Sequence, residues 1–135
     1  MVEFSDFTVA QIRIARPTDQ FEEVINFYEK GLGLRRLTEF SGHRGYQGII
    51  LGLPNAPYHL EFTKHDDGSP CPAPTQDNLL VFYIPSSHEI NVVVNRLSEM
   101  GYCEVTPENP YWEEKGTTIE DPDGWRVVLM NTNGI

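Results

Sequence analysis

The sequence predicts a single α+β domain made of two paired βαβββ modules. Hydrophobic periodicity follows the same order in both halves, with a strand, a helix and then three strands. The helix-ending glycines Gly33 and Gly101 are 68 residues apart, and the helix-starting residues Asp19 and Ser86 are 67 apart. A near-constant offset indicates one module used twice. Because neither module can bury its sheet alone, we expect one curved mixed sheet with the helices outside.

The first module is expected at about residues 7–65. Alternating side chains predict a half-buried strand over residues 8–14, which the Arg16-Pro17-Thr18 segment should end. Asp19, with Glu22 three residues later, resembles a capping box and predicts the helix start. The helix should stop near Gly31 and Gly33. Three further strands are predicted at residues 34–40, 48–53 and 58–64.

A linker is expected at about residues 66–77, because Pro70, Pro72 and Pro74 cannot sit in a paired strand. The second module follows at about residues 78–132. Its helix should start at Ser86 and end at Met100-Gly101. Its predicted strands are residues 79–84, 102–106, 116–120 and 125–131, with an irregular loop at 107–112. With 135 residues, the chain is long enough for one compact domain and too short for two ordinary ones.

Composition excludes several partners. A net charge of −10 repels phosphate backbones, so we expect no nucleic acid, and the same sign suits a cationic small molecule. No apolar run is long enough to span a bilayer, so no membrane is expected. The first residues lack a signal-peptide pattern, which predicts a cytoplasmic protein.

Two motifs resemble those of a known family. Residues 26–34 read Asn-Phe-Tyr-Glu-Lys-Gly-Leu-Gly-Leu, and Asp121-Pro122-Asp123-Gly124 forms a turn before a final apolar strand. Together with the duplication, they resemble the vicinal oxygen chelate superfamily. This superfamily includes glyoxalases, bleomycin and fosfomycin resistance proteins, and extradiol dioxygenases.

The resemblance implies two metal-ligand positions in each module. In the first module these look like Gln11 and Glu61, and the repeat offset places Leu79 and Val128 at the second-module positions. Neither apolar residue binds a metal, so the ordinary metal site is expected to be degraded. A catalytic divalent ion needs at least three protein donors, which His59 would complete on the same strand face as Glu61. The alternative is that these side chains form a hydrogen-bonded polar lining without a metal.

Strand alternation predicts a cleft with unlike walls. Gln11, Arg13, His59 and Glu61 should form a polar wall, with residues 58, 60 and 62 packed under the helix. The opposite wall is predicted from apolar and aromatic residues of the second module. Its expected members are Leu79, Val81, Tyr83, Val128 and Met130. A polar wall facing an apolar one suits a small-molecule pocket, although the apolar residues could instead fill the cleft.

Two aromatic residues in a loop, Tyr111 and Trp112, are further candidates for ligand contact or dimer anchoring. Alternatively, Trp112 packs against the sheet. The favoured function is binding of a small organic molecule without a cofactor, by a homodimer that resembles the non-metal bleomycin-resistance branch. Its expected ligand contacts are Gln11, Arg13, His59, Glu61, Tyr83, Tyr111 and Trp112. Two alternatives remain: a glyoxalase-like lyase or dioxygenase with a divalent ion on Gln11, His59 and Glu61, and a dimer without ligand. In an enzyme, Glu61 is the candidate catalytic base.

Overall fold

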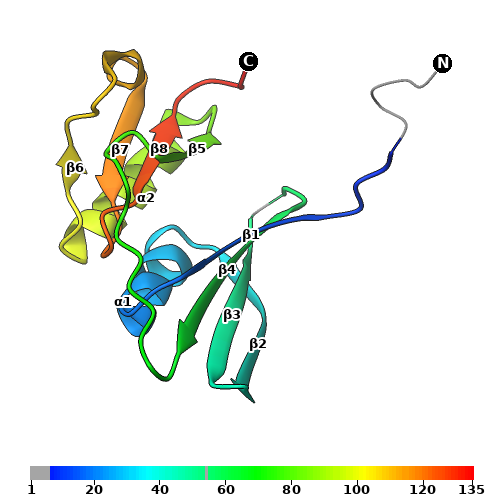
Figure 1. The fold of residues 1–135 in the computed structure, drawn as a ribbon. Helices are drawn as coiled ribbons and strands as arrows, with labels where there is room; N and C mark the ends of the chain where they lie inside the picture. The colour runs from blue at the N-terminus through cyan, green and yellow to red at the C-terminus, as the bar shows by residue number, and fades with distance from the viewer. Residues whose placement is uncertain (1–6, 54) are drawn as a thin grey trace.

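The computed structural model describes residues 7–53 and 55–135; the start of the chain, where a signal peptide was sought, lies outside this range. Two modules repeat one order of elements, each with four strands (Figure 1). The strand order is β1-β4-β3-β2 in the first sheet and β5-β8-β7-β6 in the second. The first strand of each module pairs in parallel with the last, β1 with β4 and β5 with β8. All other strand pairs are antiparallel. The predicted α+β class is confirmed, and its two mixed sheets are hydrogen-bonded separately.

The bounds of the elements are as follows. Module one contains β1 (Ile12–Pro17), α1 (Phe21–Ile25), the π-helix η1 (Asn26–Gly31), β2 (Arg35–His43), β3 (Tyr46–Gly52) and β4 (Tyr58–His65). Module two contains β5 (Leu79–Tyr83), α2 (Ser87–Glu99), β6 (Glu104–Val105), the 3-10 helix η2 (Pro110–Trp112), β7 (Gly116–Glu120) and β8 (Arg126–Met130). Residues 66–78 join the modules without helix or strand.

One hydrophobic core joins the modules. It contains the apolar faces of α1, η1 and α2 and alternate residues of β3, β4, β7 and β8. Phe27 and Leu97 are fully buried in it, and the ring of Phe27 meets that of Tyr102 edge to face at 5.0 Å. Burial of each such side chain stabilises the fold by about 1.5 to 3 kcal/mol. The core therefore fixes the helical segments of both modules against each other.

The first strand differs from its prediction. It spans Ile12–Pro17 rather than residues 8–14, so Arg16 and Pro17 lie in the strand that they were expected to end. Pro17 is tolerated because β1 is an edge strand at the point where it ends. Thr18 continues the pairing by donating its N–H to the carbonyl of Thr63 at 2.8 Å. Long-range pairing with β4, rather than local propensity, sets these bounds.

The start of the first helix was also predicted wrongly. The N-cap residue is Gln20, which has no side-chain cap, and Asp19 instead accepts a hydrogen bond from the backbone N–H of Ser69. The α-helix then changes into the wider π-helix η1 before Gly31. In module two, by contrast, Ser86 caps α2 through the N–H of Glu89 at 3.2 Å, as predicted.

The other elements differ less from their predicted bounds. The strand predicted at 102–106 keeps only Glu104–Val105, and the loop after it contains η2. Strands β2 and β3 extend to a tighter hairpin than expected, because Arg44 and Gly45 both take positive φ there. The turn before β8 forms as predicted: Gly124 donates its N–H to the carbonyl of Asp121 at 3.0 Å. Among the described residues, no helix is long and apolar enough to cross a bilayer.

Candidate functional site

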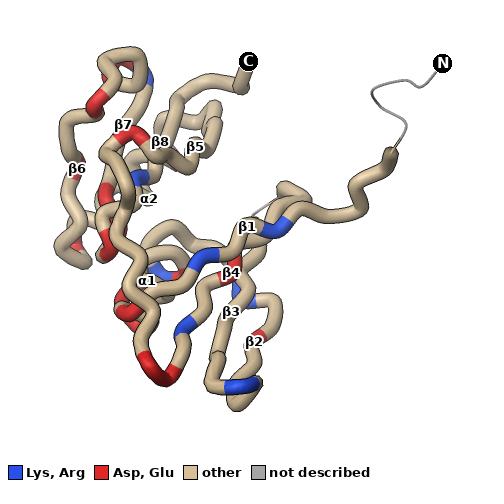
Figure 2. Tube along the Cα trace, viewed as in Figure 1, with Lys and Arg blue, Asp and Glu red and all other residues tan. Residues whose placement is uncertain are grey.

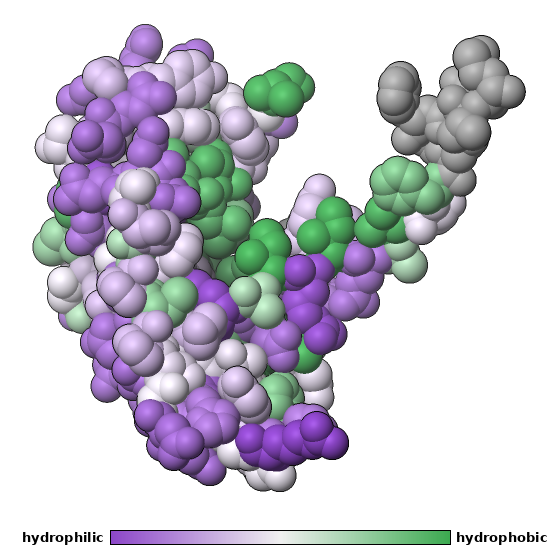
Figure 3. All heavy atoms as spheres, viewed as in Figure 1, coloured by the Kyte–Doolittle hydropathy of each residue, from purple (hydrophilic) through white to green (hydrophobic). Residues whose placement is uncertain are grey.

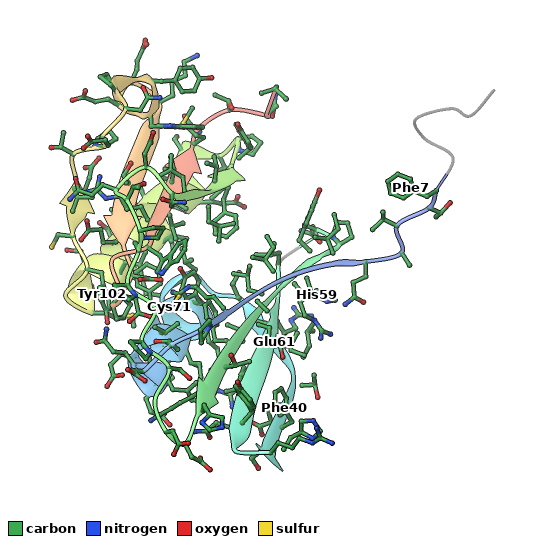
Figure 4. The ribbon with its side chains drawn as sticks, viewed as in Figure 1. Phe7, Phe40, His59, Glu61, Cys71 and Tyr102 are labelled. Atoms are coloured by element: carbon green, nitrogen blue, oxygen red, sulfur yellow. The ribbon has the colours of Figure 1, made fainter. Side chains whose placement is uncertain are left out.

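Three residues of the predicted polar wall share one face of the first sheet. Arg13 pairs with His59 and Ala15 with Glu61 across β1 and β4, and directly paired residues point to the same side. Figure 4 shows His59, Glu61 and Phe40 along this face. Gln11 lies just before β1 and is exposed. We call this surface the polar face. On the opposite face Leu60 and Phe62 pack under the helix as expected, whereas Tyr58 is 42% exposed.

Arg13 and Glu61 form a loose pair on the polar face. Nη1 of Arg13 is 3.8 Å from Oε1 of Glu61, and their side chains are 44% and 15% exposed. Such a partly exposed pair contributes at most about 1 kcal/mol. Its importance is chemical, because the guanidinium supplies positive charge beside the carboxylate that a metal would need.

The polar face does not fit a divalent ion. Gln11, His59 and Glu61 are the only donors that the sequence offered for it, and Arg13 already compensates the one carboxylate among them. In the described part of the chain, no three His, Cys, Asp or Glu side chains are grouped so that they could hold a metal. That the protein carries no metal remains a prediction.

Part of the predicted apolar wall is covered by other residues of module two. Val128 is fully buried and Met130 is 5% exposed. A methyl group added at Gly116 on β7 would lie 2.3 Å from the backbone oxygen of Trp112 and 2.9 Å from the sulfur of Met130. The segment that contains η2 therefore lies directly on this face. At Val128 the cleft is filled, whereas Leu79 on the edge strand β5 is half-buried.

The predicted aromatic contacts lie in module two. Tyr83 is 39% exposed and Tyr111 65%, and the rings of Tyr111 and Trp112 meet edge to face at 4.9 Å. The connection between β6 and β7 that carries η2 lies at the end of module two away from module one (Figure 1). Within one chain, these aromatic residues are therefore not brought together with the polar face.

A cavity of about 270 Å³ separates the two modules. Figure 3 shows a hollow there, with apolar side chains on both sides. We call it the intermodule cavity. Its lining from module one is Ile14, Ala15, Arg16, Tyr28, Leu60 and Phe62, and its lining from module two is Asn78, Leu79, Leu80, Trp125 and Arg126. Only Leu79 was among the predicted cleft residues, because Tyr28 and Trp125 have ordinary helix and strand periodicity.

A buried ionic cluster lies at this cavity. One guanidinium nitrogen of Arg16 binds Asp121, and the other binds Asp123 at 2.8 Å. Thr18 donates its hydroxyl hydrogen to Asp123 at 2.6 Å. The guanidinium lies over the ring of Phe62 at 5.0 Å and that of Trp125 at 5.2 Å, both within cation–π range. These contacts join the end of β1 to the turn before β8, and hence module one to module two.

The charges in this cluster oppose the cost of burial. Burial raises the pKa of Asp121 above its ordinary value, and Arg16 reduces that shift. Burial lowers the pKa of Arg16, but Asp121 and Asp123 outweigh it and leave that pKa raised. Desolvation thus decides the direction of the pKa shift of Asp121, whereas attraction to the two carboxylates decides that of Arg16. Since the Asp121 side chain is fully buried and bonded to two backbone N–H groups and Arg16, we conclude that it is ionised near neutral pH.

Tyr28 completes the cluster from the helical side. Its hydroxyl donates to Asp121 at 2.7 Å. Burial, and next the charge of Asp121, raise the pKa of Tyr28 well above its ordinary value. A raised pKa means that the folded protein holds this proton more tightly than the unfolded chain. The resulting stability is complete below the ordinary tyrosine pKa of about 10 and is lost as the pH rises beyond it.

Comparison with known proteins now identifies the family. Two family models match the chain, the YycE-like N-terminal domain over residues 12–63 and the YycE-like C-terminal domain over residues 77–131. An uncharacterized protein YycE from Bacillus subtilis (strain 168) is 58% identical over 132 residues, which span 98% of this chain and 95% of that protein. The chain belongs to the YycE-like family.

A solved structure supports the same YycE-like assignment. It is a YycE protein of unknown function from Bacillus subtilis, described as a candidate glyoxalase/fosfomycin resistance protein. It is 57% identical, with a TM-score of 0.92 over 99% of this chain and 98% of that one.

More distant structures share the fold of this YycE-like chain. Glyoxalase I of Leishmania major is 16% identical, with a TM-score of 0.71 over 92% of this chain and 87% of that chain. A glyoxylase/bleomycin resistance protein/dioxygenase domain from Frankia sp. EAN1pec is 20% identical, with a TM-score of 0.70 over 96% and 100%. At these identities the likeness shows the fold alone. It confirms the predicted fold, which these glyoxalase and bleomycin resistance proteins share.

The contribution of the Tyr28 hydroxyl can be measured by removing it. Tyr28→Phe should lower the free energy of unfolding by about 1 to 2 kcal/mol at pH 7, because buried Asp121 loses a hydrogen bond. Tyr102→Phe is the matched control, since its ring packs on the same Phe27 and its hydroxyl makes no hydrogen bond to a described residue. The control should change stability by less than about 0.5 kcal/mol. Equal effects in urea unfolding would contradict the role of the Tyr28 hydroxyl.

Proposed function

We propose that this YycE-like protein binds a small organic molecule in the intermodule cavity. The observation that carries this proposal is the cavity itself, about 270 Å³ with walls from both modules. Its lining is mostly apolar and aromatic, with few polar groups. This composition is typical of ligand sites in proteins, whose usual volumes of about 300 to 1,000 Å³ begin near this one. The cavity thus suits a compact ligand.

The polar and aromatic groups of the cavity are fixed before any ligand arrives. Arg16 is held by two carboxylates, and the indole N–H of Trp125 donates to the backbone oxygen of Cys71 at 2.8 Å. A site with fixed side chains loses little entropy on binding. The two charged residues in the lining, Arg16 and Arg126, are each paired with a carboxylate, so the cavity suits an uncharged or aromatic ligand.

A binding role is favoured over a glyoxalase-like or dioxygenase reaction. Such a reaction would need a divalent ion on Gln11, His59 and Glu61, and the polar face offers a poor donor set beside Arg13. We therefore propose no catalytic role for Glu61. The intermodule cavity lies against Ile14 and Arg16, on the other face of the first sheet, so ligand binding there does not depend on a metal.

Fluorescence of Trp125 can test binding directly. In a Trp112→Phe background Trp125 is the remaining tryptophan, and titration with aromatic cations, basic glycopeptides and uncharged aromatic compounds should give a saturable change for at least one class. Ile14→Phe should weaken that binding by about tenfold or more, because Ile14 lies on the cavity side of β1 and the larger ring occupies part of a cavity this small. Val92→Phe is the control, since Val92 is exposed on α2 and outside the cavity.

No saturable change with any class would contradict the proposal. Equal weakening by Ile14→Phe and Val92→Phe would place the ligand elsewhere.

We also propose that the protein is a homodimer that uses the free edge of β1. The side chains of Ile12 and Ile14 on this edge strand are 40% and 52% exposed, and Val9 and Phe7 before it are 55% and 73% exposed. Unprotected apolar edges are sites of strand pairing with another chain. Figure 3 shows apolar side chains along β1 and the described residues before it. A second copy would cover them.

Charge favours contact between unlike modules of two copies. Residues 12–65 contain seven Lys and Arg against six Asp and Glu, whereas residues 78–131 contain three against nine. Figure 2 shows the basic segments along the first sheet and mainly acidic ones in module two. In a two-fold dimer, module one of each copy can face module two of the other, which reduces repulsion between two acidic chains.

Sedimentation velocity at micromolar concentrations should show a dimer. Ile12→Lys should weaken the dimer by about tenfold or more, because it places a charge in the proposed interface. Val92→Lys is the control, since Val92 is 45% exposed on α2, away from the β1 edge. A monomeric wild-type protein, or equal effects of the two variants, would contradict the proposed interface.

A further inference from the structure

Four residues form one row across the first sheet on the polar face. Arg13 pairs with His59, His59 with Gly52, and Gly52 with Arg35, so the row crosses all four strands. Neighbouring strands are about 4.8 Å apart, and directly paired residues point to the same side. The row therefore carries two guanidinium groups and an imidazole on one face, with a side-chain gap at Gly52.

A second cavity lies at this gap. Its volume is about 300 Å³, and it is more polar than the intermodule cavity. Three side chains with N–H groups line it, those of Arg35, Asn55 and His59, together with Leu37 and Leu53. The glycine in the row matters because any larger side chain at position 52 would project between Arg35 and His59. The cavity is thus a place where N–H donors from three segments meet beside an apolar surface.

The charge at this cavity is not compensated within the described chain. Elsewhere in the chain, Arg13, Arg16, Arg36 and Arg126 each have a carboxylate within 4 Å, whereas Arg35 at this cavity has none among the described residues. Glu61 is the acidic residue of β4 on this face, and it lies beside Arg13 at the other side of the row. In a protein of net charge −10, a cavity bordered by an uncompensated guanidinium is a local exception.

We propose that this cavity binds the anionic group of a small organic molecule, a carboxylate or a phosphonate-type group. The planar fork of Arg35 matches the paired oxygens of either group, and Asn55 and His59 supply further N–H donors. Leu37 and Leu53 would contact the apolar part of the same molecule. A metal cation is a poor occupant because the site offers donors and positive charge. This site shares no lining residue with the intermodule cavity, so a negative result at either site leaves the other proposal unaffected.

Two substitutions and one matched control test the site. Arg35→Gln removes the charge. Arg44→Gln makes the same change at the tip of the β2–β3 hairpin, where Arg44 has no carboxylate within 4 Å among the described residues and borders neither cavity. Gly52→Ala changes no charge but fills the gap, and the atoms nearest its new methyl group would be those of the flexible Leu37 side chain at 3.1 to 3.3 Å. Gly52 lies in β3 and has no positive φ, so this variant should fold.

Titration with phenylphosphonate, benzoate and the cation benzamidinium, followed by nuclear magnetic resonance, should separate the possibilities. We expect at least one of the two anions to bind saturably and to shift the Arg35 side-chain N–H signal, while benzamidinium does not. Arg35→Gln and Gly52→Ala should each weaken anion binding by about tenfold or more, the effect of losing a charge-assisted hydrogen bond or its space. Arg44→Gln should leave it unchanged.

Comparison of the two anions shows which group the site prefers. The proposal is overturned if neither anion saturates, if Arg44→Gln weakens binding as much as Arg35→Gln, or if Gly52→Ala binds normally.

Discussion

The contact between Arg16 and the two carboxylates of the Asp121-Pro122-Asp123-Gly124 turn holds the rest of the structure in place. It joins residues that are 105 and 107 positions apart in the chain. Each module has its own hydrogen-bonded sheet, and within residues 7–53 and 55–135 no strand pairing crosses between them. The shared core fixes the helical segments, and the ionic cluster, which meets that core at Tyr28, joins the end of β1 to the turn before β8. Both walls of the intermodule cavity depend on it.

Such a cluster is not explained by stability alone. Taking three charges out of water costs several kcal/mol per ion, and apolar side chains of similar volume often stabilise a fold as well or better. Hydrogen bonds from Thr18, Tyr28 and two backbone N–H groups offset that cost here. Directional bonds also allow only one arrangement of the two modules, whereas an apolar contact would permit sliding. We infer that the cluster sets geometry, while the core around Phe27 and Leu97 supplies most of the stability.

Local patterns allowed the repeat to be predicted from the sequence, and distant contacts limited the rest. The cap at Ser86 and the turn at Gly124 depend on neighbouring residues, and both formed as predicted. Strand β1 lies closer to Pro17 than predicted because pairing with β4 determines its bounds. A single sequence does not reveal that partner. The π-helix in the first module likewise meets module two, where Arg96 donates to the carbonyl of Gly31 at 2.8 Å.

The same distinction applies to the candidate sites. Strand alternation correctly placed His59, Glu61 and Arg13 on one face. It did not indicate Arg35, because the place of Arg35 opposite Gly52 depends on the pairing of β2 with β3, which a single sequence does not reveal. Tyr28 and Trp125 were missed as cavity residues because their spacing is that of ordinary core positions. The one available signal was two carboxylates in a turn between apolar strands, which need a positive partner if they are buried.

A double-mutant cycle tests most directly whether the ionic cluster couples the two modules. Arg16→Met, Asp121→Asn and the double variant would be compared by urea unfolding at neutral pH. We predict a coupling free energy of about 2 kcal/mol, within the range found for residues in direct contact, because each single variant leaves a buried partner uncompensated. Additive effects, with a coupling near zero, would show that the cluster does not hold the modules together.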